Sequence, residues 1–327
     1  MIQYRQMKFR ELKKSLTAKI ESIYLVCGDD AFFVEYSAKL ICDACLKMPE
    51  MNLTRFESNI LKEDYDKFNS ALLSYPFMSE KRVVMIKELN PAASEIAKLK
   101  EYCAKPNETT VLLICNTSSS DALKKLPNVT IVDCSRGDDA LISAWIKNQA
   151  KISGLTVTDG AISKLISYCL SDMTRINGET AKLIAYCADL GTITENDVDA
   201  LCVKESDYRL YEIVDFIAAR NYDKAYASFT DMLETSGDGQ KLFVSLYYYF
   251  RRLLYASISS ATNAEIAEAL KVKEFAVTMA KRQAKAFSPK RLKAVTDKLA
   301  ALDYAFKSGR TEQTSAVWNG ILEVLIG

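Results

Sequence analysis

The chain has 327 residues, 49% of them hydrophobic, with 43 Lys and Arg balanced by 42 Asp and Glu. This length and apolar content indicate a globular protein of two or three domains, each able to bury its own core. The chain contains no histidine, which excludes Ser-His-Asp and Cys-His nucleophiles, His-ligated zinc sites and His general bases. No carboxylate pair has a convincing catalytic spacing, so a binding or mechanical role is favoured over a catalytic one.

The nine cysteines are an odd number and mostly lie inside apolar runs. That usage is typical of reduced cysteines packed as small hydrophobes in a cytosolic protein. Cys42 and Cys45 form a single C-x-x-C within a predicted helix, and packing is the favoured interpretation. The N-terminal segment has no signal-peptide pattern, and no apolar run approaches the ~18 residues of a membrane span. We expect a cytoplasmic protein without a membrane partner.

The first clear element is a strand, a turn and a helix over residues 22–40. A nucleotide-binding protein keeps its phosphate loop at this place, with glycines to wrap the phosphates and a Lys followed by Ser or Thr. Here Phe33 and Val34 stand where Gly and Lys would be needed, and Asp29 and Asp30 would repel phosphate. We therefore predict no bound cofactor, and in particular no ATP.

Further along, short apolar and largely β-branched runs alternate with amphipathic segments. Buried parallel strands are predicted at Ile23–Cys27, Arg82–Ile86, Val111–Cys115 and Val129–Val132. This alternation predicts an α/β layer structure. The strand at Arg82 ends in Lys87, where a Walker B strand would supply an Asp for magnesium, so a second part of an ATPase site is missing.

From Asp139 onward the sequence predicts only helices. Ile162, Leu165 and Ile166 share one face at helical spacing, and Thr194 begins a capping box for a helix ending at Leu201. Ser288-Pro289 predicts a helix start and Gly309 a helix stop. We predict three domains, an α/β domain at 1–138, a small helical domain at 139–207 and an all-helical domain at 208–327.

Residues 271–310 hold eleven Lys and Arg against three acids. Lys281, Arg282 and Lys285 are candidate contacts to DNA phosphates, and a solvated helix face is the alternative. The segment Glu265–Val272 and the basic helix after it resemble a helix-turn-helix, but the turn has no glycine, so sequence-specific DNA reading is disfavoured.

Several segments resemble the delta subunit of bacterial DNA polymerase III, in the same order along the chain. They are Ile23–Asp30, Pro76–Ile86, Asn107–Ile114, the lid motif Asn177–Leu183 and Lys307–Gly309. The lid motif departs from the usual Asn-Glu-Leu-Glu-Lys-Leu in having Gly178. The resemblance implies a degenerate AAA+-like fold that binds no ATP, followed by a lid and a collar, in a non-catalytic component of a DNA-directed DNA polymerase holoenzyme.

The resemblance also implies a clamp-binding wedge at Pro76 and Phe77, flanked by Tyr75 and Met78. Proline fixes its own φ and keeps the preceding residue extended, which suits a preshaped apolar knob. The alternative from the residues alone is that Tyr75, Phe77 and Met78 pack in the core, where large apolar side chains usually lie. The resemblance favours the wedge for Phe77 only.

The partners that the resemblance implies are the sliding clamp (the beta subunit), the tau/gamma motor ATPases, the delta-prime subunit and primed DNA within the assembled loader. Its implied function is to bind and open the clamp for loading on primed DNA. Two rival functions stay open from the sequence. They are an active AAA+ ATPase with an atypical phosphate loop, which ATP hydrolysis would support, and a helix-turn-helix regulator, which specific duplex binding would support.

Overall fold

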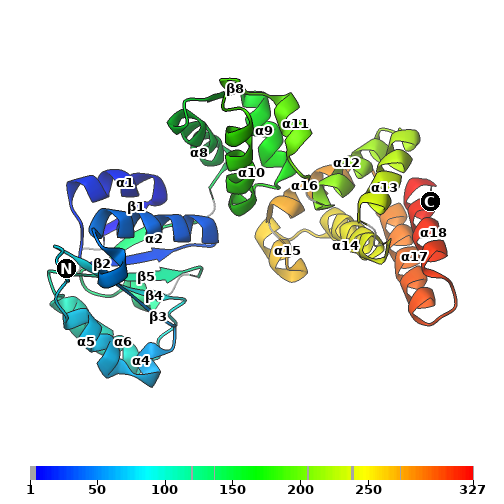
Figure 1. Ribbon diagram of the computed structural model, residues 1–327. Coiled ribbons are helices and arrows are strands. Elements are labelled where there is room, and N and C mark those ends of the chain that lie inside the picture. The colour runs from blue at the N-terminus through cyan, green and yellow to red at the C-terminus, as the bar shows by residue number, and fades with distance from the viewer. Residues whose placement is uncertain are drawn as a thin grey trace. The chain divides into compact units, whose positions relative to one another are not determined.

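The computed structural model describes residues 5–118, 121–135, 137–204, 206–236, 239–272 and 274–326. The chain divides into two compact units, Met1–Leu141 and Ile142–Gly327. Figure 1 shows the first unit as a layered α/β structure and the second as almost entirely helical.

The first unit is built on one six-stranded sheet in which every pair of neighbouring strands is parallel. The strand order is β1-β6-β2-β5-β4-β3. The strands are β1 (Arg5–Lys8), β2 (Ile23–Cys27), β3 (Leu53–Phe56), β4 (Arg82–Lys87), β5 (Thr110–Asn116) and β6 (Thr130–Asp133). The four strands predicted from the sequence are confirmed, whereas β1 and β3, which form the two edges, were not predicted.

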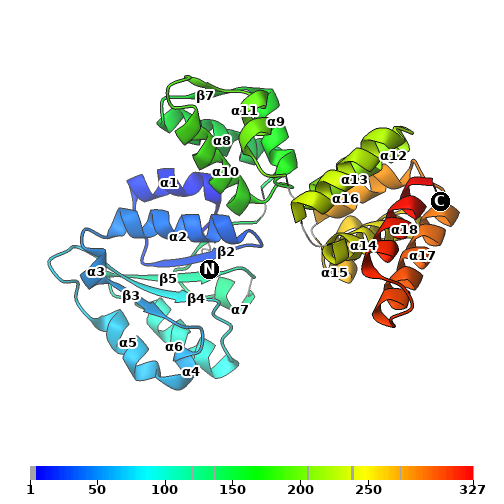
Figure 2. The ribbon, with the colours of Figure 1, turned by 45° about the vertical axis from the view of Figure 1, so that its right-hand side comes forward.

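Helices cover both faces of this sheet (Figure 2), with α1 and α2 on one side and α4, α5 and α6 on the other. The helices of the unit are α1 (Phe9–Ala18), α2 (Ala31–Cys45), α3 (Pro49–Asn52), α4 (Ile60–Glu63), α5 (Tyr65–Leu73), α6 (Ala93–Ala104) and α7 (Asp121–Lys124). Because both faces are covered, all five residues of β2 are buried. Burying one such aliphatic side chain contributes about 1.5–3 kcal/mol, so this strand anchors the unit.

The second unit contains eleven described helices when α8, which begins at the unit boundary, is included. They are α8 (Asp139–Ile152), α9 (Asp159–Tyr168), α10 (Met173–Tyr186), α11 (Glu195–Leu201), α12 (Ser206–Ala218), α13 (Tyr222–Ser236), α14 (Gly239–Ile258), α15 (Asn263–Leu270), α16 (Glu274–Ala284), α17 (Pro289–Lys307) and α18 (Gln313–Ile326).

The prediction of helices alone after Asp139 is wrong at one point. Two short strands, β7 (Thr156–Val157) and β8 (Thr192–Ile193), pair in parallel between helices. Their two-residue length explains the miss, because alternation of apolar and polar residues needs at least four residues to be seen.

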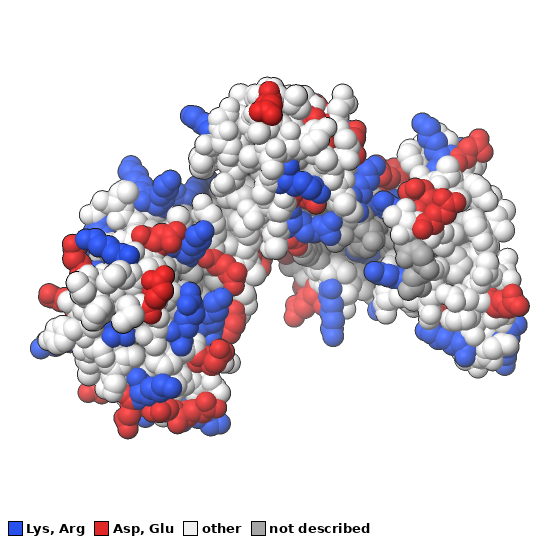
Figure 3. Space-filling model, viewed as in Figure 1, with Lys and Arg blue, Asp and Glu red and all other residues white. Residues whose placement is uncertain are grey.

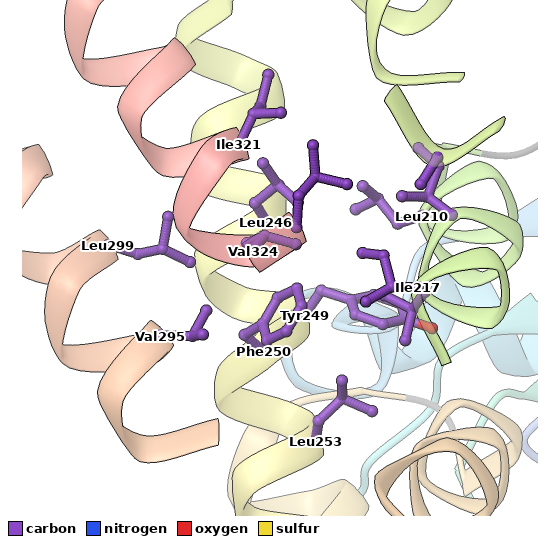
Figure 4. Packing of buried hydrophobic residues seen from close by; sticks show 14 of the residues in the cluster. Leu210, Ile217, Leu246, Tyr249, Phe250, Leu253, Val295, Leu299, Ile321 and Val324 are labelled. Carbon is purple, nitrogen blue, oxygen red and sulfur yellow. The ribbon is translucent and has the colours of Figure 1, made fainter. Parts of the chain in front are cut away.

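The core of the C-terminal helices is centred on α14, whose side chains Leu246, Phe250 and Leu253 are fully buried. Figure 4 shows α14 flanked by side chains from α12, α17 and α18. Every residue of this core lies at or beyond Leu210. Helices α12, α13, α14, α16, α17 and α18 therefore share one hydrophobic core.

The helix boundaries predicted here are confirmed. The Ser288 hydroxyl accepts a hydrogen bond from the Arg291 backbone N–H, with Pro289 at the first helical position. Gly309, which follows the C-cap Ser308 of α17, takes the left-handed conformation (φ 72°), which glycine adopts without steric cost. An α/β domain followed by helices, as the sequence predicted, is the observed fold class.

Candidate functional site

An exposed apolar knob lies in the loop between α5 and β4. Tyr75, Phe77 and Met78 are 84%, 51% and 80% exposed. The interpretation of these three residues as core is therefore wrong. Pro76 between them is half-buried. Large apolar side chains grouped in this way on a surface mark an interaction site.

Two further exposed large hydrophobic residues lie close in the chain to residues that form or contact the knob. Leu73, the last residue of α5, and Met51, in α3, are also exposed large hydrophobic residues, at 56% and 58%. Met51 is the chain neighbour of Asn52, whose side chain bonds the backbone of Phe77. Leu73 could have been found from the sequence, since it precedes Pro76 by three residues, whereas Met51 lies 26 residues before Phe77 and gives no local signal.

The backbone of the knob has an uncommon conformation at Met78 and is hydrogen-bonded to Asn52. Met78 has φ 46°, in the left-handed region that is uncommon for residues other than glycine. The Phe77 N–H donates to Asn52 Oδ1 (2.7 Å), and Asn52 Nδ2 donates to the Phe77 carbonyl (3.0 Å). Together with the fixed φ of Pro76, these features give the loop a defined shape.

The turn after β2 is filled by the protein itself. Asp30 caps α2, because its Oδ1 accepts hydrogen bonds from the N–H groups of Phe32 (3.0 Å) and Phe33 (3.4 Å). Those are among the free donors that a helix N-terminus offers to a phosphate. The Phe33 side chain is fully buried and that of Val34 is 3% exposed, so both residues at the Gly and Lys positions serve the core.

The strand end at which a Walker B motif would supply an Asp for magnesium carries an ion pair instead. Lys87 Nζ donates to Glu35 Oε1 on α2 at 2.9 Å. This hydrogen bond raises the pKa of Lys87, which keeps a positive charge at the place of the Walker B carboxylate. Among the described residues, no group of three or more Cys, Asp or Glu side chains could hold a metal ion.

A groove of about 330 Å³ lies beside this ion pair, between α2 and strands β3 and β4. Its wall includes Val34, Ala38 and Met85, with Lys39, Asp43 and Arg55 among its charged residues. The mixed charges give the groove no net attraction for a triphosphate.

Comparisons with known proteins agree over both units. A model of the "DNA polymerase III, delta subunit" family matches residues 24–135, and a model of the "DNA polymerase III delta subunit, C-terminal domain" matches residues 207–324. The chain belongs to the DNA polymerase III delta-subunit family. DNA polymerase III subunit delta of Bacillus subtilis is 23% identical over 97% of this chain and 96% of its own.

A solved structure extends the likeness of this delta-family chain to the fold. The Bacillus subtilis DNA clamp loader delta protein (YqeN) matches with a TM-score of 0.78 and 22% identity, over 97% of this chain and 99% of that one. Across the described residues, no helix combines the length and apolar character that a membrane span requires.

The three basic residues predicted to face DNA lie on or just after α16, and two of them have intramolecular partners. Lys281 Nζ donates to the Ala261 carbonyl (3.1 Å). The Arg282 guanidinium lies 3.6 Å from Asp215 Oδ2 and 5.1 Å from the centre of the Tyr211 ring. Lys285 is exposed. On the face shown in Figure 3, basic and acidic side chains are interspersed over both units.

Proposed function

We propose that this chain binds the sliding clamp through the exposed knob of its first unit and holds the clamp ring open for loading on primed DNA. Two features together support the proposal. Phe77 is exposed while its backbone is hydrogen-bonded to Asn52, and in the turn after β2 the Asp30 carboxylate occupies donors that a nucleotide phosphate would need. A loop aromatic that fills a partner pocket behaves as a hot spot of binding. Phe77 is the anchor, with Tyr75, Pro76 and Met78 around it.

Because Asp30 fills the turn after β2, this proposal assigns ATP hydrolysis to other subunits of the loader. A subunit that cannot use ATP depends on neighbours that do, which in this proposal are the tau/gamma motor subunits, with delta-prime completing the loader. The neighbours' nucleotide state controls the exposure of the knob by shifting the equilibrium between loader conformations. In this assignment residues 1–138 bind the clamp, residues 139–207 form the lid and residues 208–327 form the collar. The chain itself is non-catalytic.

The rival functions have weaker support. Asp30 and Lys87 occupy the positions at which an active ATPase needs phosphate and magnesium ligands. For a helix-turn-helix regulator, α15 and α16 do form a helix pair, with Lys271 at φ 54° in the turn. However, Lys281 and Arg282 on α16 contact other parts of the chain.

Calorimetric titration of the purified chain with the purified clamp of the same organism tests the proposal. We expect saturable binding without any nucleotide, because the knob is exposed in the isolated chain. Absence of clamp binding, with or without Mg-ATP, would refute the proposal.

A further inference from the structure

The side chain of Asn52 is almost completely buried, at 1% exposed, yet it bonds only backbone groups. Asn52 Oδ1 accepts from the Phe77 N–H (2.7 Å), while Asn52 Nδ2 donates to the carbonyls of Phe77 (3.0 Å) and Met48 (3.2 Å). The orientation of the amide is fixed by its partners, since only oxygen can accept from an N–H and only the NH₂ group can donate to carbonyls. The Asn52 side chain therefore bonds both the N–H and the carbonyl of Phe77, the proposed anchor of the knob. We call this pair of hydrogen bonds the bracket.

The sheet register explains how residues 25 positions apart meet. Asn52 directly precedes the edge strand β3, and the knob precedes β4. These strands are parallel neighbours with Leu53 opposite Val83, so the segments leading into them lie at the same end of the sheet. At this end of the sheet, the Asn52 side chain connects the segment before β3 to the segment before β4.

Few other polar contacts hold this loop, and one of them is the exposed pair of Lys47 Nζ with Glu80 Oε1 at 3.4 Å. In the described chain, no backbone-to-backbone hydrogen bond joins residues 76–80 to another segment. The left-handed backbone of Met78 is also an uncommon conformation for a non-glycine residue, which the surroundings must enforce. Without the bracket, the loop would have many more accessible conformations.

We propose that Asn52 is the positioning residue that presents Phe77 to the clamp. The inference rests on the proposed function, because it assumes that Phe77 is the anchor. A preshaped loop binds more tightly than a mobile one because less conformational freedom is lost on association. If the binding-competent loop is only a fraction of the population, the apparent Kd rises by the inverse of that fraction.

The chain offers a matched control. Asn116, 3% exposed, brackets Leu89 in the same way, accepting from its N–H (3.0 Å) and donating to its carbonyl (2.8 Å). Leu89 lies just beyond the carboxyl end of β4, while the knob precedes the amino end of that strand. Loss of either bracket leaves two backbone groups without their partner, so both losses should destabilise the fold, but only the loss at Asn52 alters the knob.

The experiment is a double-mutant cycle in the full chain, with Asn52→Ala, Phe77→Ala and the two combined, and with Asn116→Ala as control. Clamp Kd is measured well below the Tm of every variant. We expect Asn52→Ala to weaken clamp binding about tenfold, the loss of roughly one to two net hydrogen bonds. In the Phe77→Ala background it should weaken binding no further, because the anchor is already absent. Asn116→Ala should lower the Tm and leave the Kd unchanged.

Two outcomes would overturn the inference. One is an Asn52→Ala variant with wild-type clamp affinity, and the other is an Asn52→Ala effect that persists in the Phe77→Ala background, as a general structural defect would. Wild-type clamp binding by Phe77→Ala itself would instead refute the proposed function, so the two failures are distinguishable.

If Asn52→Ala does not fold, Asn52→Leu takes its place in the cycle, since leucine keeps the buried volume and lacks the amide. Hydrogen exchange of the Phe77 amide gives a second readout that needs no clamp. Exchange should be about tenfold faster in the Asn52 variant than in the wild type, and unchanged exchange would contradict the bracket.

Discussion

At the scale of single residues, the two main features of the first unit are a carboxylate that replaces a ligand and an aromatic ring left exposed. Asp30 accepts two N–H groups at the start of α2, where a phosphate would bind in a nucleotide-binding turn. Phe77 has half of its side chain in solvent although the chain has ample core to bury it. One residue closes the turn after β2 and the other offers a surface to a partner.

Gly28, in the same turn, gives a prediction about packing. A Cβ added there would lie 2.1 Å from the Cys134 carbonyl carbon and 2.4 Å from the Ser135 backbone nitrogen. Backbone atoms cannot move aside as a flexible side chain can, so we expect Gly28→Ala to lower the free energy of unfolding by about 1–3 kcal/mol. Urea unfolding measures this.

The matched control is Gly178→Ala, in the interior of α10, where an added Cβ meets no atom within 4 Å. Removing a glycine from a helix interior should stabilise the protein by about 0.5–1 kcal/mol. Equal effects of the two substitutions would show that the turn after β2 is looser than the structure indicates.

At the scale of elements, α2 carries the prediction about nucleotide. Asp30 occupies two of the N–H donors at the start of α2, and Lys87, paired with Glu35, stands where a Walker B carboxylate would bind magnesium. We expect no heat of binding when Mg-ATP is titrated into the chain, and none with Asp30→Ala, because removing the cap does not supply the missing Lys. Micromolar binding by either protein would contradict this account.

The strands show which secondary-structure elements the sequence could predict. Strands β2 and β5 are buried along their whole length, so their apolar runs predict them directly. The edge strand β3 has no buried residue, and β1 has only Met7 buried. Edge strands that are polar and partly exposed lack the pattern on which strand prediction depends.

The candidate site was only half predictable for a related reason. Tyr75, Phe77 and Met78 stand together in the chain and could be named from it. Asn52 joins the site through the parallel pairing of β3 with β4, and β3 itself gave no signal. A single asparagine in a sequence also carries no sign that its side chain will be buried and bonded.

At the scale of the whole molecule, the two units carry different tasks in the proposed loader. The first unit holds the knob, while residues 271–310 of the second unit hold eleven Lys and Arg against three acids. Contact with DNA phosphates would then be a property of the assembled collar and depend on salt, because each neutralised phosphate releases counterions.

Neutralising single basic residues tests the collar in the assembled loader. We expect Lys285→Ala to reduce the slope of log affinity for primed DNA against log salt by about one, since Lys285 is exposed. Lys281→Ala is the matched control and should leave the slope unchanged, because Lys281 Nζ already bonds the Ala261 carbonyl. Equal slopes for Lys285→Ala and wild type would identify Lys285 as part of a solvated face.

The central claim is that Phe77 anchors the clamp, and paired measurements on Phe77→Ala test it most directly. Truncating an aromatic hot spot costs about 2 kcal/mol or more of binding, whereas truncating a core phenylalanine costs about 3–5 kcal/mol of stability. Because Phe77 is 51% exposed, we predict a clamp Kd at least about thirtyfold weaker with a Tm close to that of the wild type. A variant that melts several degrees lower and binds the clamp as tightly as the wild type would contradict the account.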